Sequence, residues 1–465
     1  MKSRGYEKRL LAYKDTDLGR RSFVYSHGVM QWTVALEGGP RRVNHAAVAI
    51  GDRTMLSVVS CCETTIMCLF NCGRKMNVLS GICVIYYVHT RKMNVFSFGG
   101  YCSGETVDAD QPIDIHMLDT NTYRWIFIKA HSDVQDDDRM EGDNMESSRS
   151  LPYQRYGHTV CAYRGRAYLW GGRNDDYGAS STLHEFDPML LRWRVVPVEG
   201  RVPPARDGHS AVVVGDRMYL FGGFEEDLQR FSQETYVFDF QTNRWSELNT
   251  TGQPPLWRDF HTAVAINSKM YIFGGRSDHT GQFHSTRDMY DERLKALDLR
   301  TGEWSEPICS GVSPTGRRSH SAWTYGGKMY IFGGYLGTQN MHYDDLFSFD
   351  PSTNHWEKIK TSGRMPSARR RQCTVVVDSR VFLFGGTMPV KNPSGTPSGL
   401  ADLADLYVLD YAPSLKHLAA GVVLRHNLHK TYADHIPLDL SRELWAMTTP
   451  NAISTPFTQR HDALG

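Results

Sequence analysis

Residues 209–223 read HSAVVVGDRMYLFGG and hold two runs of strand-forming residues around a Gly-Asp pair. A two-residue turn between β-rich runs predicts a tight antiparallel hairpin. The second run is apolar at nearly every position, as in a strand that neighbouring sheets bury on both faces. It ends at Gly222-Gly223, where a backbone without Cβ atoms bends freely. The stretch therefore predicts the inner hairpin of a sheet that is stacked between similar sheets.

The same diglycine after an aromatic or apolar run recurs six times along the chain. The six runs end at Gly100, Gly172, Gly223, Gly275, Gly334 and Gly386. The last four intervals between these positions are 51, 52, 59 and 52 residues. A period of about 50 residues is that of kelch repeats, each of which forms one four-stranded blade of a β-propeller. A tryptophan follows five of the diglycines, and its ring suits the wedge between two blades: Trp125, Trp193, Trp245, Trp304 and Trp356.

The two ends of the repeat array predict how the ring closes. After Gly386 comes the strand-like stretch 406–410, but no tryptophan follows it, whereas Trp32 stands alone before the first repeat. We expect the N-terminal strand to complete the last blade, because a closed ring leaves no free sheet edge. The predicted fold is all-β: a six-bladed kelch β-propeller over residues 30–411, closed by an N-terminal strand and followed by a short C-terminal α-helical segment.

Two stretches interrupt the repeats, and an extension precedes them. Residues 54–94 fall inside the first hairpin and carry five cysteines, but no Cys-x-x-Cys pair, so a zinc site is the weaker alternative. The hypothesis is that this stretch is not a functional module but translated intervening sequence. By the same reasoning, Met30 is the expected working start and residues 1–29 a basic, disordered extension. Residues 129–152 are rich in Asp, Glu and Ser, which predicts a solvated loop between the first two blades.

The composition narrows the class of protein. With 52 Lys and Arg against 51 Asp and Glu, the chain lacks the basic excess that direct nucleic-acid binding normally requires. The first 29 residues contain no apolar run of signal-peptide length, and no stretch is apolar enough to cross a membrane. Nine cysteines without framework spacing favour a reducing compartment. We expect a cytoplasmic protein, with a nuclear pool left open.

Each inner strand is preceded by Arg-x-x-His or a close variant of it. The arginines of these motifs are Arg42, Arg155, Arg206, Arg258, Arg317 and Arg370. Because such loops connect successive blades, the arginines are expected to gather around one mouth of the central channel. Converging guanidinium groups repel one another unless an anion or acidic groups compensate, and arginine binds carboxylates through paired hydrogen bonds. The motif therefore favours a peptide carboxylate as ligand, whereas its histidines are expected to brace neighbouring loops.

Further arginines add to the same predicted mouth. Two follow diglycines directly and others neighbour the motif arginines, which gives this candidate set: Arg173, Arg206, Arg258, Arg276, Arg317, Arg318 and Arg370. No G-x-S-x-G, P-loop or H-E-x-x-H pattern occurs, so the sequence predicts no catalytic residues, no metal and no cofactor. A copper or iron propeller enzyme stays as an alternative, because distant loops can bring metal ligands together.

The chain changes character after the last blade. Leu415, Leu418, Ala419, Val422 and Val423 recur at helical spacing, and Pro413-Ser414 suits a helix start. Residues 412–449 are therefore predicted to form helices, with 450–465 as a tail. In the plainest interpretation, these helices simply pack under the propeller.

The helical segment also carries two motifs of a known family. Ser414-Leu415-x-x-x-Ala419-x-x-x-Val423 resembles the elongin-binding box, and Ile436-Pro437-x-x-Leu440 resembles the adjacent cullin 2 box. Outside residues 54–94, the stretch 30–449 resembles kelch-repeat substrate receptors of cullin 2–elongin ubiquitin ligases. Matching stretches include RYGH at 155, ARDGHSA at 205, WRDFH at 257, GRRSHSA at 316 and RRRQC at 369.

The resemblance implies a non-catalytic adaptor of the ubiquitin-conjugation pathway. Such a receptor binds C-terminal degrons ending in glycine, and its partners are elongin C with elongin B, and cullin 2 with its RING subunit. It implies that Arg276 and Ser319 hold the terminal carboxylate. It also implies that elongin or cullin is contacted by Leu415, Ala419, Val423, Ile436, Pro437 and Leu440. The alternative is a kelch scaffold for chromatin or cytoskeletal partners that has no role in a ligase.

Overall fold

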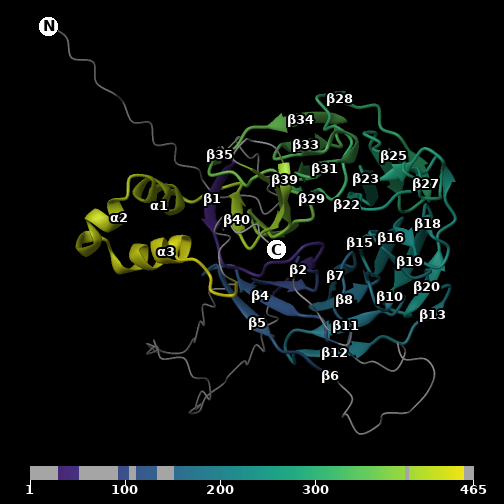
Figure 1. Cartoon of the computed structure of the whole chain (residues 1–465), viewed down its shortest axis with the longest axis horizontal. Helices are drawn as coiled ribbons and strands as arrows, with labels where there is room; N and C mark the ends of the chain where they lie inside the picture. Colours follow the sequence, from purple (N-terminus) through teal and green to yellow (C-terminus); the bar gives the residue numbers. More distant parts are fainter. Residues whose placement is uncertain (1–29, 52–92, 104–110, 133–150, 393–396, 455–465) are drawn as a thin grey trace, which may run out of the picture.

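The computed structural model describes residues 30–51, 93–103, 111–132, 151–392 and 397–454. Six sheets stand around a common centre, and the helices lie beside the ring next to β1 (Figure 1). Each sheet is a blade whose innermost four strands pair antiparallel, and in five of the blades a short fifth strand pairs parallel at the outer edge. The predicted β-propeller is confirmed.

The blades repeat one strand order from the centre outward. The first blade consists of β2 (Ala46–Gly51), β3 (Met93–Phe98), β4 (Ile115–Asp119) and β5 (Arg124–Ile128). The second consists of β7 (Thr159–Tyr163), β8 (Arg166–Trp170), β11 (His184–Asp187), β12 (Arg192–Val195) and β6 (His131–Ser132). The third consists of β15 (Ser210–Val214), β16 (Arg217–Phe221), β19 (Thr235–Asp239), β20 (Arg244–Glu247) and β13 (Glu199–Gly200). The fourth and fifth consist of β22 (Thr262–Ile266), β23 (Lys269–Phe273), β26 (Lys295–Asp298), β27 (Glu303–Ser305) and β21 (Thr251–Gly252); and β29 (Ser321–Tyr325), β30 (Lys328–Phe332), β33 (Leu346–Asp350), β34 (His355–Ile359) and β28 (Ser310–Gly311).

The sixth blade contains both ends of the propeller. Its strands are β36 (Cys373–Val377), β37 (Arg380–Phe384), β40 (Leu406–Asp410), β1 (Gln31–Leu36) and β35 (Ser362–Gly363). Because β1 pairs antiparallel with β40 and parallel with β35, the N-terminal strand completes the blade that the C-terminal repeat begins. This is the predicted closure.

Short ladders connect the second and third strands of the blades. They are β9 (Arg173–Asn174) with β10 (Gly178–Ala179); β14 (Arg206–Asp207), β17 (Phe224–Glu225) and β18 (Arg230–Phe231); β24 (Ser277–Asp278) with β25 (Asp288–Met289); β31 (Tyr335–Leu336), η1 (Gly337–Gln339) and β32 (Met341–His342); and β38 (Thr387–Lys391) with β39 (Pro397–Asp402).

Aromatic contacts between blades follow the sequence pattern. Each outer-strand tryptophan packs on the aromatic residue that precedes the diglycine of the neighbouring blade, with ring centroids 5.0 to 5.9 Å apart. The six pairs are Trp32–Phe332, Trp125–Phe384, Trp193–Phe98, Trp245–Trp170, Trp304–Phe221 and Trp356–Phe273. Trp32 thus takes the place of the sixth repeat's missing tryptophan.

Six backbone hydrogen bonds join the interblade loops into a second closed ring. In each Arg-x-x-His motif, or its variant, the residue before the last donates its N–H to the carbonyl oxygen of its counterpart in the preceding blade, over 2.7 to 3.3 Å. We call these residues the neck ring: Asn44, Gly157, Gly208, Phe260, Ser319 and Arg371. All six have left-handed backbone conformations, with φ between 48° and 69°.

The two interrupting stretches are shorter than predicted. Met93 and Asn94 belong to β3, where they pair with Gly51 and Ile50, so the first interruption ends before residue 93. Its cysteines lie outside the described residues, as do 1–29. His131 and Ser132 form the outermost strand of the second blade, so residues 129–132 are not part of the loop. The remaining acidic residues, 133–150, lie outside the described part of the chain.

Deleting residues 54–94 should leave a folded propeller with an unchanged or higher melting temperature. In the other five inner hairpins a two-residue turn joins the strands, as Gly215-Asp216 does between Val214 and Arg217. The deletion recreates this turn as Gly51-Asp52, with Arg53 opposite Ile50. Circular dichroism during heating provides the measurement.

The control for this deletion removes one residue more, 54–95. It shifts β3 by one position and exchanges the two faces of the strand, which should destabilise the first blade. Loss of the fold in the 54–94 deletion itself would contradict the expected result.

The helical segment is α1 (Leu415–Arg425), α2 (Leu428–Thr431), η2 (Ala433–His435) and α3 (Leu438–Thr448). The Ser414 side chain caps α1 by accepting the His417 N–H. Ala420 and Met447 are buried in one hydrophobic cluster with Val34 and Phe384 of the sixth blade. The helices therefore pack on the seam at which the ring closes.

The predicted tail begins with an ordered clasp. The Asn451 side chain accepts the Trp125 N–H and donates to the Tyr123 carbonyl, and its own N–H donates to the Glu37 carbonyl. Arg124 donates to the carbonyls of Ala446 and Thr449 at the end of α3. Residues 450–454 thus join the first blade to the end of β1, while 455–465 lie outside the described residues.

Candidate functional site: a charged mouth and an exposed helical face

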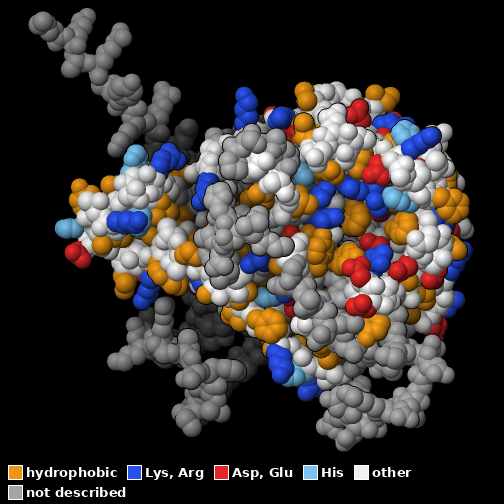
Figure 2. Space-filling view, in the orientation of Figure 1, with side chains coloured by type: hydrophobic (Ala, Val, Ile, Leu, Met, Phe, Trp, Pro, Cys, Tyr) orange, Lys and Arg blue, Asp and Glu red, His pale blue; other side chains and the backbone are white. Residues whose placement is uncertain are grey.

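One end of the central channel is formed by the Arg-x-x-His loops and by the residues after the diglycines. These two sets meet in backbone bridges such as Tyr156↔Arg173, Asp259↔Arg276 and Arg318↔Tyr335. Figure 2 shows a group of Lys and Arg side chains beside a group of Asp and Glu side chains near the middle of the ring. The mouth is therefore divided into a basic and an acidic sector.

The arginine side chains at the first position of the Arg-x-x-His motifs do not reach this mouth. Five of them are at most 1% exposed: Arg155, Arg206, Arg258, Arg317 and Arg369. In each, Nε donates to the carbonyl oxygen two residues earlier and Nη1 donates to the carbonyl of the first diglycine residue that follows. The motif arginine is thus a built-in cross-link between a loop and the end of an inner strand.

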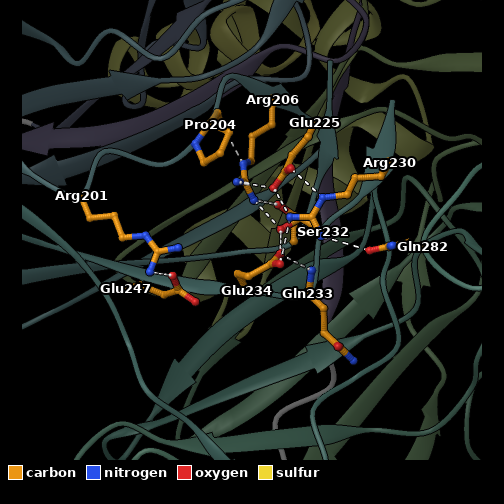
Figure 3. A network of polar contacts seen from close by, with 11 residues as sticks. Arg201, Pro204, Arg206, Glu225, Arg230, Ser232, Gln233, Glu234, Glu247 and Gln282 are labelled. Atoms are coloured by element: carbon orange, nitrogen blue, oxygen red, sulfur yellow. Dashed lines mark hydrogen bonds and ion pairs between the residues drawn. The ribbon is translucent and has the colours of Figure 1, made fainter. Parts of the chain in front are cut away.

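A carboxylate neutralises four of these arginines. The Arg206 guanidinium lies 2.7 Å from Glu225, which also binds Arg230, as Figure 3 shows. The other three pairs are Arg258–Asp291, Arg317–Asp345 and Arg369–Asp405. The prediction that Arg206, Arg258 and Arg317 bind a ligand is therefore wrong, because their donors are used internally and their side chains are fully buried. In the sixth motif the structural arginine is Arg369, and Arg370 is its neighbour.

The motif histidines brace adjacent blades, as predicted. His209, His261 and His320 place Nε2 within 2.7 to 2.8 Å of a hydroxyl oxygen in the preceding blade. Burial, followed by the nearby motif arginines, lowers the pKa of His45, His158 and His320 to about 3. These imidazoles are neutral structural groups.

The basic sector consists of Arg318, Arg370 and Arg371. Arg370 lies 4.2 Å from the Tyr335 ring centroid, and Arg371 donates to the Tyr101 hydroxyl over 2.6 Å. Arg318 has a distant carboxylate partner, Asp288, at 3.8 Å. Within the described ranges, Arg370 and Arg371 form no ion pair with a carboxylate.

Repulsion between the arginines of this sector adds to the effect of burial on the pKa of Arg370. Burial, then Arg371 and Arg318, lower that pKa to about 10. Burial, then Arg370 and Arg371, lower the pKa of His342 to about 4, so its imidazole is neutral. An anion placed here would relieve the repulsion between guanidinium groups.

The acidic sector neutralises two arginines that were predicted to bind ligand. Arg276 forms a two-point ion pair with buried Asp259, with its Nε 3.1 Å from Oδ1, and Arg173 lies 3.6 Å from Glu226. Both arginines are partly exposed at the mouth. Burial and the neighbouring Asp259 raise the pKa of Asp207 to about 7. This sector therefore favours a cation.

The two sectors flank a cavity of about 470 Å³. Its lining includes Tyr101, Tyr156, Asp175, Phe260 and Arg371. The cavity thus extends from a basic end at Arg371 to an acidic end at Asp175. Ser319 is the neck-ring residue between Phe260 and Arg371, and its N–H donates to the Phe260 carbonyl over 2.9 Å.

The helical segment exposes most of the apolar face predicted for it. Leu415 is 83% exposed, and Leu418, Ala419, Val422 and Pro437 are also exposed. Val423, Ile436 and Leu440 are partly buried and pack against the hydrophobic cluster at the seam. The helices therefore pack on the propeller with one side and leave apolar residues exposed on another.

Among the residues that the structure describes, no group of His, Cys, Asp and Glu side chains is arranged to hold a metal ion. None of the described helices combines the length and hydrophobicity needed to span a bilayer.

Comparison with known proteins identifies the class. A family model described as KLHDC2/KLHL20/DRC7 Kelch-repeats domain matches residues 157–386. Together with the bladed ring, this defines a kelch-repeat protein-interaction protein, a class whose members are typically non-catalytic interaction modules.

Sequence relatives then identify the family. Kelch domain-containing protein 3 of Bos taurus is 40% identical over 93% of this chain and 100% of its own length, and that of Homo sapiens is 39% identical over the same shares. Host cell factor 2 of Homo sapiens is 32% identical over 52% of this chain and 31% of its own length. The chain belongs to the Kelch domain-containing protein 3 family.

Proposed function

We propose that the protein is the substrate-recognition subunit of a cullin 2–RING ubiquitin ligase and binds C-terminal degrons that end in glycine. The observation that carries the proposal is the pair Arg370 and Arg371, half-buried at the mouth without carboxylate partners in the described ranges. Paired guanidinium groups match the geometry and charge of a terminal carboxylate. The ligase partners, not this chain, transfer ubiquitin.

The division of the mouth supports a polypeptide end as ligand. If the terminal carboxylate of a polypeptide binds in the basic sector, the residues before it in that polypeptide lie over the cavity. The far end of the cavity is acidic at Asp175. A basic side chain three residues before the terminal glycine, as in Arg-x-x-Gly, would approach the acidic groups. Arg276 and Ser319 remain within this proposed site, with Arg276 held by Asp259 and Ser319 in the neck ring.

The exposed side of the helical segment supports a docking role for elongin C and cullin 2. Leu415, Ala419 and Pro437 present exposed side chains on one module. We assign Val423, Ile436 and Leu440 to positioning that module, because they pack on the propeller. Since Leu415 takes no part in the seam, its replacement separates partner binding from folding.

A reporter protein ending in Arg-x-x-Gly should be degraded faster in cells that contain this protein than in cells that lack it. Extending the reporter by one lysine should abolish the difference, because the carboxylate then lies beyond the glycine. Leu415→Asp should also abolish it, and should reduce co-purified elongin C and cullin 2 at least about tenfold. Reporter lifetime and affinity purification are the measurements.

The control variant for this experiment is Ile308→Asp, which alters another exposed apolar residue of the propeller and should change nothing. The ligase role would be contradicted if neither elongins B and C nor cullin 2 co-purified with the protein and Leu415→Asp left the reporter lifetime unchanged. That result would favour a kelch scaffold for other partners.

A further inference from the structure

The neck ring contains one bulky apolar residue in a backbone conformation that disfavours it. Phe260 has φ 48°, whereas Gly157 and Gly208 occupy the equivalent positions of the preceding blades. The left-handed region costs a non-glycine residue about 1–2 kcal/mol, and asparagine tolerates it better than a bulky side chain. Glycine or asparagine, as at Asn44, would therefore form the same ring with less strain.

Core packing does not account for Phe260. The residue is only half-buried, and it belongs to none of the hydrophobic clusters found among the described residues. Its ring covers Gly208 instead: a Cβ atom added at that glycine would lie 3.4 Å from the Phe260 Cδ2 atom. The same side chain lines the mouth cavity together with Arg371.

Phe260 lies close to Arg371 of the basic sector along the neck ring. Its carbonyl oxygen accepts the Ser319 N–H, and the Ser319 carbonyl accepts the Arg371 N–H, so the three residues are consecutive in the neck ring. When the terminal carboxylate of a polypeptide binds at Arg371, the α-carbon of its last residue lies only one bond from the carboxyl carbon. The first side-chain atom of a terminal residue therefore lies close to the cavity wall at the neck.

We propose that Phe260 is a specificity-determining residue of the mouth, whose ring excludes a side chain on the last residue of the bound polypeptide. This inference rests on the proposed function and specifies how that site selects glycine. The ring occupies space that Gly157 and Gly208 leave open in the neighbouring loops. The strained backbone at Phe260 is retained because the side chain is needed in the cavity.

Replacement of Phe260 by glycine or asparagine tests this inference without disturbing the ring. Both residues already occupy neck positions, so Phe260→Gly and Phe260→Asn should fold with unchanged or higher melting temperatures. The probes are two fluorescent peptides with free carboxylates, ending in Arg-x-x-Gly and Arg-x-x-Ala. Wild-type protein should bind the alanine peptide at least about tenfold more weakly, the usual scale for one excluded methyl group.

Both variants should bind the two peptides within about threefold of each other, mainly because the alanine peptide gains affinity. Phe283→Ala, which removes an exposed ring from the loop between β24 and β25, should keep the wild-type preference. Retention of that preference in both folded Phe260 variants would overturn the role of Phe260 alone. Failure of the wild-type protein to bind either peptide would overturn the proposed function, and this inference with it.

Discussion

Replacing Arg370 by glutamine should weaken binding of a peptide that ends in a free glycine carboxylate by about 30-fold. A hydrogen bond to a charged group contributes about 1.5–3 kcal/mol, which is a factor of about 10 to 150 in affinity. Stability should not fall, because the substitution removes a half-buried charge that Arg371 and Arg318 oppose. Fluorescence anisotropy measures the affinity, and thermal unfolding measures the stability.

The matched control for Arg370 is Arg300→Gln. Arg300 is 75% exposed in the turn between β26 and β27, away from the mouth, and should leave peptide affinity unchanged. Equal affinity of Arg370→Gln and wild-type protein would remove Arg370 from the site. A fall in affinity accompanied by a loss of stability would show that the charge is structural instead.

Replacing the preceding residue, Arg369, by methionine should have the opposite consequences. It should lower the free energy of unfolding by about 3–5 kcal/mol, the cost of leaving one partner of a buried ion pair uncompensated. Arg369 is fully buried, and its two Nη atoms lie 2.6 and 2.7 Å from the two oxygens of Asp405. The carbonyl oxygens of Ser367 and Gly385 lose a donor as well.

Denaturant unfolding of Arg369→Met and of the double variant Arg369→Met/Asp405→Leu measures this cost. The double variant should regain part of the lost stability, because it removes the buried carboxylate that the single variant leaves unpaired. A loss below about 1 kcal/mol in the single variant would contradict the structural role assigned to the motif arginines.

The fold could be predicted in detail because its signal is repeated. The diglycine period, the tryptophan spacing and the isolated Trp32 each depend on short-range patterns that a blade imposes on its own sequence. The ends of the two interrupting stretches could be predicted less accurately than the fold. Met93 and His131 enter strands through pairing with Gly51 and Arg192, and such pairing leaves little trace in the local sequence.

The motif arginines show that the motif alone does not distinguish a ligand-binding arginine from one that is paired inside the protein. The sequence identifies the repeated guanidinium groups, but their partners lie well downstream in the chain. A signal was present, since in three blades the residue directly before the third strand is an aspartate: Asp114, Asp345 and Asp405. Each of the three pairs with a motif arginine. An acid repeated in step with an arginine indicates an internal ion pair rather than a vacant cationic site.

His342 and Tyr335 were absent from the predicted site for a different reason. They lie in the short ladder of β31 and β32 and approach each other with ring centroids 4.6 Å apart. This ladder has no fixed motif, so only the folded ring brings it beside Arg370. The functional parts of a repeat protein are the positions at which the repeats differ, and a pattern built on similarity passes over them.

In the proposed function, the mouth binds the free carboxyl end of a polypeptide. The most direct measurement compares two fluorescent peptides ending in Arg-x-x-Gly, one with a free carboxylate and one with a terminal amide, against the full-length protein. The amide removes the negative charge and changes little else, so its binding should be weaker by about 30-fold or more. Equal affinity for the acid and the amide would contradict the claim.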